Sequence, residues 1–166
     1  MIISCFMDSS LEKLAQQVVN ALTKQGLQLI TAESCTAGWV AKAITDVAGA
    51  SRCFERGFIT YSNAAKEEML AVRPATLSRH GAVSEAVVRE MAAGALAASH
   101  ADISVAVSGV AGPDGGTADK PVGLVWLAWQ LNTDCRVLQA NFSGGRDAIR
   151  RAAVTAALQG VLTLIE

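Results

Sequence analysis

Apolar residues recur along this chain with two different periods, and each change of period falls at glycine, proline or polar residues. A Ser9-x-x-Glu12 capping box, followed by apolar residues three and four positions apart, predicts a helix that ends at Gly26. Short continuous apolar runs between turn residues predict buried strands. The pattern predicts strands over 27–32, 54–61, 102–108, 122–129 and 136–142, and further helices over 36–47, 63–70, 74–80, 84–98 and 147–165.

Strands that alternate with helices predict an α/β protein, a three-layer α/β/α sandwich around a five-stranded mixed sheet. No helix separates the last three strands, so the strand over 122–129 is expected to run antiparallel to its neighbours. The other four strands then end at one edge of the sheet, where open α/β sheets bind ligands. One domain is expected over 1–166, with 1–8 as a loosely ordered extension.

A polar segment follows each of the four strands that share a direction. These segments are 33–36, 61–66, the loop that starts at Ser108, and 143–146. The loop is glycine-rich, with four glycines and two prolines between Val107 and Val122. Glycines let backbone amides approach a ligand closely, and compact domains rarely keep long loops without a use. A ligand site is therefore expected at this edge, and a plain connecting loop is the alternative.

Composition narrows the class of protein. Hydrophobic residues make up 51% of the 166 residues, which indicates a core-rich globular chain. A net charge of −1 without a basic run argues against nucleic-acid binding, and no uninterrupted apolar run is long enough for a membrane span. The four cysteines lack Cys-x-x-Cys spacing and no signal peptide is recognised, so reduced thiols in the cytoplasm are expected. With only two histidines, a histidine triad or a histidine-rich metal site is hard to build. No metal and no cofactor are expected.

The first two polar segments carry candidate chemistry. Ser34 and Thr36 lie where a strand is expected to turn into a helix, and free amides there favour an anion or an oxyanion; simple helix capping is the alternative. Lys66 lies one turn into a short helix. If it is partly buried, its lowered pKa suits it to take a proton from a serine, whereas a solvated lysine would have no such role.

Two further side chains are candidates for contacting a substrate. Tyr61 is the only tyrosine, and it ends a predicted strand close to Lys66. It is either a proton relay or substrate contact, or a core ring with a solvated hydroxyl. Arg146 follows two glycines at a helix start, where its charge opposes the helix dipole unless an anion binds. A solvated basic face, shared with Arg150 and Arg151, is the alternative.

Several ordered motifs of this sequence closely resemble the CinA C-terminal domain family. They are Ala32-Glu-Ser-Cys-Thr-Ala-Gly-Trp39, Arg56-Gly-Phe-Ile-Thr-Tyr-Ser-Asn63 with Lys66, His80-Gly-Ala-Val-Ser84, Ser108-Gly-Val-Ala-Gly-Pro-Asp-Gly-Gly116 with Lys120-Pro-Val-Gly123, and Gly145-Arg146. The resemblance runs from about Leu11 to the C-terminus. It implies an α/β/α sandwich and the hydrolysis of the carboxamide of nicotinamide mononucleotide to nicotinate mononucleotide and ammonia. The family's enzymes are described as serine amidases assisted by lysine, without metal.

The resemblance also implies roles for individual residues. Ser34 resembles the nucleophile, Lys66 the base and Tyr61 a helper. The substrate-binding residues implied are Thr36, Ser51, Asn63, Ser108, Gly109 and, for the phosphate, Arg146. Ser51 also matches a serine of the family pattern, but the predicted topology places it at the opposite edge of the sheet. It is the second candidate for the nucleophile, or a residue that acts at a neighbouring subunit's site.

The sequence differs from the family pattern at two positions, and a second function is also considered. Ala37 stands where many relatives have glycine, which is tolerable if that residue is helical. Gly145 stands where many have aspartate, so an acid beside Arg146 is missing. The rival is a module that binds a nucleotide or phosphate without turnover, in competence or DNA-damage responses. A homo-oligomer is expected, packed through the alanine-rich stretches 92–98 and 152–157.

Overall fold

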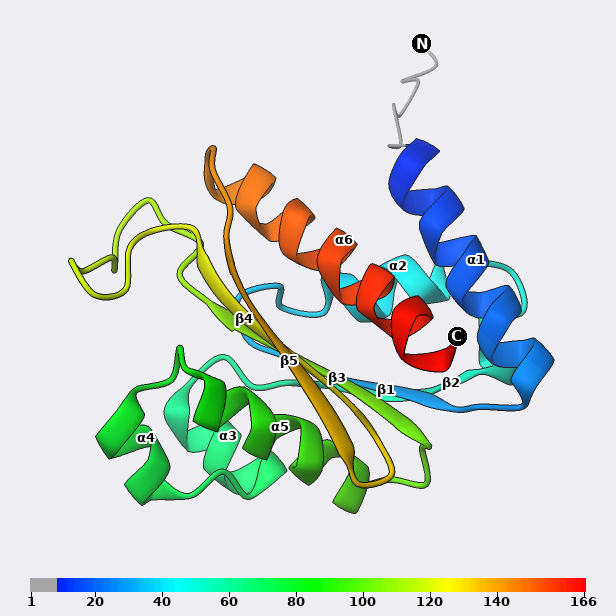
Figure 1. Ribbon diagram of the computed structural model, residues 1–166, viewed down its shortest axis with the longest axis horizontal. Helices are drawn as coiled ribbons and strands as arrows, with labels where there is room; N and C mark the ends of the chain where they lie inside the picture. Colours follow the sequence, from blue (N-terminus) through cyan, green and yellow to red (C-terminus); the bar gives the residue numbers. More distant parts are fainter. Residues whose placement is uncertain (1–8) are drawn as a thin grey trace, which may run out of the picture.

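The computed structural model describes residues 9–166, and the expectation for residues 1–8 lies outside this part. A five-stranded sheet forms the middle layer, between two layers of helices (Figure 1). The elements in chain order are α1 (Ser9–Gln25), β1 (Leu29–Glu33), α2 (Trp39–Thr45), the 3-10 helix η1 (Ala50–Arg52), β2 (Phe54–Ile59), α3 (Asn63–Leu70), α4 (Pro74–His80), α5 (Glu85–Ala97), β3 (Ile103–Gly109), β4 (Leu124–Leu131), β5 (Asp134–Asn141) and α6 (Arg146–Ile165).

The strands lie in the order β2-β1-β3-β4-β5. β1 pairs in parallel with both β2 and β3, whereas β4 is antiparallel to β3 and to β5. β4 is therefore the single strand of opposite direction, and the predicted mixed sheet is confirmed. Since β1, β2, β3 and β5 end at the same edge, the four polar segments emerge there together.

Each face of the sheet buries its own apolar core. Helices α1, α2 and α6 cover one face and α3, α4 and α5 the other (Figure 1). In α1 the helical spacing places Val18 and Leu22 in the first core, and in α5 the same spacing places Val88 and Met91 in the second. Burial of these apolar helix faces stabilises the packing of the layers by roughly 1.5–3 kcal/mol for each large side chain.

Helix α6 is a core helix, although by length and composition it could cross a membrane. Its Ile149 and Leu158 are fully buried against the sheet and α1. Part of each alanine-rich stretch that was expected to contact another subunit packs inward. Ala92 and Ala95 lie in one core, and Ala153 and Ala157 in the other. Ala93, Ala97 and Ala98 of the first stretch are exposed, so the expected contact through these stretches stays a prediction.

The predicted helix over 36–47 is shorter in the structure, where α2 begins at Trp39 and ends at Thr45. Residues 34–38, here called the nucleophile turn after the predicted role of Ser34, form a loop between β1 and α2. Ala37 and Gly38 both have left-handed backbones, with φ of 50° and 91°, which stops the helix from starting earlier. The expectation that Ala37 is helical is therefore wrong. Glycine would adopt this conformation without the strain that alanine bears.

Candidate active site

The side chains of Ser34 and Lys66 meet at the carboxyl edge of the sheet. Ser34 comes directly after β1, and its amide donates to the carbonyl of Val107 on β3 over 2.9 Å. Lys66 comes from α3, and its Nζ lies 3.0 Å from Ser34 Oγ and donates to the Thr60 carbonyl over 2.7 Å. Both side chains are buried, with exposures of 8% for Ser34 and 1% for Lys66. The structure thus joins two polar segments that lie 32 positions apart.

Burial makes it easier for Lys66 to lose its proton. Desolvation lowers the pKa of its amine below the ordinary value of 10.5. Within residues 9–166 no carboxylate forms an ion pair with this amine, so no such pair raises its pKa again. A neutral amine at 3.0 Å can accept the serine proton, which is the geometry that a nucleophile and its base require.

The local sequence fixes the start of α3 and hence the place of Lys66. Ser62 caps this helix, and its Oγ accepts a hydrogen bond from the Ala65 amide over 3.0 Å. Lys66 follows one turn later, with its side chain directed inward. Asn63 is the first residue of the helix and is exposed at the same edge.

The carboxylate of Glu33, the last residue of β1, is fully buried beneath the nucleophile turn. It accepts hydrogen bonds from the amides of Gly38, Val40 and Ala41 over 2.9–3.0 Å. These are the first amides of α2, so they are already satisfied and do not form the anion site that was expected at this helix start. Thr36 is not the helix cap either, because Gly38 holds that position. Sequence reasoning missed Glu33, for which an acid at the end of a buried strand was the available signal.

Arg150 of α6 holds the nucleophile turn from another direction. Its guanidinium donates to the carbonyls of Cys35 and Thr36 over 3.0 and 2.9 Å, and it lies 5.2 Å from the centre of the Trp39 ring. Sequence reasoning gave Arg150 no role beyond a basic face. No local pattern reveals a contact between residues 115 positions apart.

Arg146 and Tyr61 meet at the rim of this edge. The Arg146 guanidinium donates to the Tyr61 hydroxyl over 3.1 Å and to the Gly112 carbonyl over 2.6 Å. These two partners orient Arg146 in place of the missing acid at Gly145. The Tyr61 side chain is 60% exposed, so it is not a core ring, and its hydroxyl contacts Arg146 rather than Lys66.

The other predicted residues take different places. Ser108 is buried and its hydroxyl donates to the Ala82 carbonyl over 2.8 Å. Gly109 packs closely on β4, where an added Cβ would lie 2.8 Å from the Leu124 carbonyl oxygen. Thr36 is buried, and its hydroxyl has no hydrogen-bond partner within the described residues. Ser51 is exposed in η1 before β2, so within one chain it lies at the opposite edge and is not brought to Ser34.

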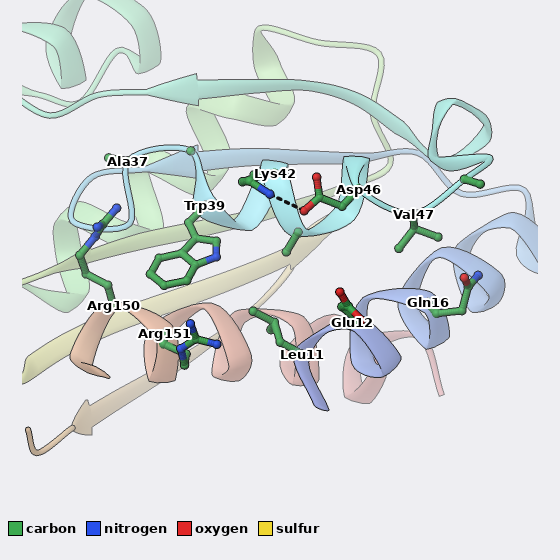
Figure 2. A pocket seen from close by; sticks show the side chains of 13 residues that line it. Leu11, Glu12, Gln16, Ala37, Trp39, Lys42, Asp46, Val47, Arg150 and Arg151 are labelled. Atoms are coloured by element: carbon green, nitrogen blue, oxygen red, sulfur yellow. Dashed lines mark hydrogen bonds and ion pairs between the residues drawn. The ribbon is translucent and has the colours of Figure 1, made fainter. Parts of the chain in front are cut away.

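A cavity of about 650 Å³ lies between α1, α2 and α6, next to the nucleophile turn (Figure 2). Trp39 and the two arginines Arg150 and Arg151 line one end of it, and the Lys42–Asp46 ion pair lies farther along (Figure 2). Neither Ser34 nor Lys66 lines this cavity. In the described part of the chain, no three histidine, cysteine or acidic side chains gather into a metal-ligand group.

The sequence profile of the CinA C-terminal domain matches residues 11–165. The chain belongs to the CinA C-terminal domain family. It is similar to nicotinamide-nucleotide amidohydrolase PncC of Escherichia coli K12, with 57% identity over 153 residues that cover 92% of this chain and 93% of that protein. PncC of Enterobacter agglomerans is 53% identical over 157 residues, which cover 93% and 95% of the two chains.

Solved structures of CinA proteins share the fold. The competence/damage inducible protein CihA of Agrobacterium tumefaciens superposes with a TM-score of 0.95 at 44% identity, over 97% of this chain and 99% of that one. Some CinA relatives are longer. A CinA-like protein of Akkermansia muciniphila is 52% identical over 155 residues, which are 93% of this chain but 37% of that protein. The CinA match spans every candidate residue from Ser34 to Arg146.

Proposed function

We propose that this protein hydrolyses the carboxamide of nicotinamide mononucleotide to nicotinate mononucleotide and ammonia. The observation that carries the proposal is the buried contact of 3.0 Å between Lys66 Nζ and Ser34 Oγ. It supplies a nucleophile with its own base, without histidine. The 57% identity to a nicotinamide-nucleotide amidohydrolase supplies the substrate class.

In the first half of the reaction, neutral Lys66 takes the proton from Ser34 as Oγ attacks the carboxamide carbon. The tetrahedral intermediate collapses when its C–N bond breaks, and the ammonium of Lys66 returns the proton to the departing nitrogen. Ammonia leaves and the acyl group stays on Ser34. In the second half a water molecule gives its proton to Lys66 and attacks the ester. The serine regains its proton as the carboxylic acid departs.

Backbone amides of the nucleophile turn are available to stabilise the oxyanion. Among residues 9–166, the amides of Cys35 and Thr36 donate no hydrogen bond to another residue. They follow Ser34 directly, so they lie beside the atom at which negative charge develops. The amides at the start of α2 are not available, since Glu33 already accepts from them.

The rim residues are proposed to bind the rest of the nucleotide. Arg146 is exposed and links Tyr61 to the glycine-rich loop, so it suits the phosphate as a charged, forked donor. The exposed ring of Tyr61 offers a surface for the pyridine, and Asn63 offers an amide. We propose that the Ser108 hydroxyl does not bind the nucleotide directly, because it already donates to the carbonyl of Ala82.

Assembly and location are also proposals. Residues Cys35, Cys53 and Cys135 are free thiols, as expected for a reducing cytoplasm. Because several alanines of the predicted stretches are buried, a homo-oligomer would also use other surfaces. The edge strand β2, where Ile59 is 53% exposed, is the one we propose.

The test is ammonia release from nicotinamide mononucleotide, with a chelator present, by the wild type, Ser34→Ala and Lys66→Ala. Release by the wild type and loss of nearly all turnover in both folded variants would support the proposal. The exposed Lys24 of α1 provides a matched control, and Lys24→Ala should keep full activity. Full activity in Ser34→Ala would exclude this nucleophile and favour Ser51. Nucleotide binding without any ammonia release would instead indicate a binding module.

A further inference from the structure

The backbone of the nucleophile turn is held by side chains from two other elements. The carbonyls of Cys35 and Thr36 both accept from the guanidinium of Arg150, which comes from α6. The amide of Gly38 donates to the carboxylate of Glu33, which comes from β1. One side chain therefore fixes carbonyls of the turn, and the other fixes an amide.

The planarity of the peptide bond turns the contact with Arg150 into an orientation of the next amide. The carbonyl of Cys35 and the amide of Thr36 belong to one trans peptide unit, so they point in opposite directions. When Arg150 holds this carbonyl, the Thr36 amide is directed to the other side of the turn. The next peptide unit obeys the same geometry. There the Thr36 carbonyl faces Arg150, and the Ala37 amide donates to the Ser34 carbonyl over 3.1 Å.

We propose that Arg150 is a positioning residue for amide hydrolysis, which orients the Thr36 amide as a donor to the oxyanion formed at Ser34. This inference rests on the proposed function. A cation bound to the Cys35 carbonyl also polarises the peptide unit and makes its N–H a stronger donor. This role does not require Arg150 to contact the substrate, because Arg150 lines the cavity of about 650 Å³, whereas Ser34 and Lys66 do not.

The Trp39 ring contacts the guanidinium of Arg150, and the neighbouring Arg151 supplies a control. The centre of its ring lies 5.2 Å from the Cζ of Arg150 and 5.3 Å from that of Arg151. Both arginines line the same cavity, as Figure 2 shows, and Arg150 is the one that donates to the carbonyls of Cys35 and Thr36. Arg151→Ala therefore removes an equal charge from the same place without releasing these carbonyls.

The experiment compares kcat and KM for nicotinamide mononucleotide in the wild type, Arg150→Ala, Arg150→Lys and Arg151→Ala. We expect Arg150→Ala to lose roughly 10²-fold in kcat, as when one oxyanion donor is lost, with KM changed by less than about threefold. Arg150→Lys should fall between it and the wild type, because lysine keeps the charge but not the fork. Arg151→Ala should behave as the wild type.

Rescue separates positioning from a structural role. Guanidinium chloride at about 20 mM, far below the molar concentrations that unfold proteins, should enter the adjoining cavity and restore part of the kcat of Arg150→Ala. A kcat for Arg150→Ala within about threefold of the wild type would overturn the inference. A loss without rescue that tracks a lower melting temperature would overturn it as well. If Arg150→Ala does not fold, the same threefold criterion is applied to the kcat of Arg150→Lys. Absence of ammonia from the wild type would refute the proposed function itself.

Discussion

Replacement of Lys66 by methionine should change how stability depends on pH. Burial lowers the pKa of this amine in the folded protein below 10.5, whereas the unfolded chain keeps the ordinary value. Between the two pKa values the unfolded chain holds one more proton, so the free energy of unfolding rises with pH by about 1.4 kcal/mol per unit. Below the folded-state pKa both states are protonated and the full destabilisation is present. Above 10.5 both are neutral and it is gone.

Lys66→Met keeps the unbranched shape of the side chain and removes the titrating group. It leaves Ser34 Oγ and the Thr60 carbonyl without a donor, which costs a constant amount at every pH. The stability of the wild type minus that of Lys66→Met should therefore rise with pH by up to about 1.4 kcal/mol per unit once pH exceeds the folded-state pKa. In a chain of this size each kcal/mol corresponds to about 2–4 °C in melting temperature.

The assay is urea unfolding of the wild type, Lys66→Met and the exposed control Lys24→Met from about pH 6 to about pH 10. Other titrating groups cancel in the difference between the wild type and each variant. A difference between the wild type and Lys66→Met that stays flat over this whole range would refute the argument, because it would mean that Lys66 titrates alike in the folded and unfolded chains. The difference for Lys24→Met should be flat.

Three further predictions concern the pH dependence of the rate, the Glu33 carboxylate and the packing at Gly94. The kcat/KM of the wild type should rise with pH through one ionisation below 10.5, since the proposed base is neutral Lys66. A rate that does not change with pH would contradict this. Glu33→Gln should lower the free energy of unfolding by about 2–4 kcal/mol in urea titrations, because the new amide faces a buried N–H in place of an acceptor. Gly94→Ala should cost about 1–3 kcal/mol and reduce kcat, because its Cβ would meet the Leu70 carbonyl at the end of the helix that carries Lys66. Gly145→Ala, with open space around its Cβ, is the matched control and should be close to the wild type in both measurements.

The architecture could be predicted because it depends on local patterns. The spacing of apolar residues gave the helices, and the lack of a helix between β3, β4 and β5 required an antiparallel strand among them. The meeting of four polar segments at one edge follows from strand direction alone. Ser34 and Lys66 were candidates from their motifs, and the structure brings them to 3.0 Å, while their catalytic roles remain predictions.

The errors arose where a side-chain contact, and not the apolar pattern, decided a local conformation. The helix predicted from Thr36 starts at Trp39, because the buried Glu33 carboxylate binds its first amides and the two residues before it are left-handed. Tyr61 ends near a lysine in the sequence, yet its hydroxyl contacts Arg146, 85 positions away.

By itself, the sequence determined the elements, the direction of each strand and the edge at which polar groups gather, because hydrophobic periodicity and connection length act over a few residues. Only the tertiary structure decided which polar groups meet. The burial of Lys66, and hence its lowered pKa, comes from layers packed around it. The orientation of the nucleophile turn comes from Glu33 on one side and Arg150 on the other. These contacts depend on directional hydrogen bonds, and those of Lys66 and Arg150 join segments far apart in the chain, which no local pattern records.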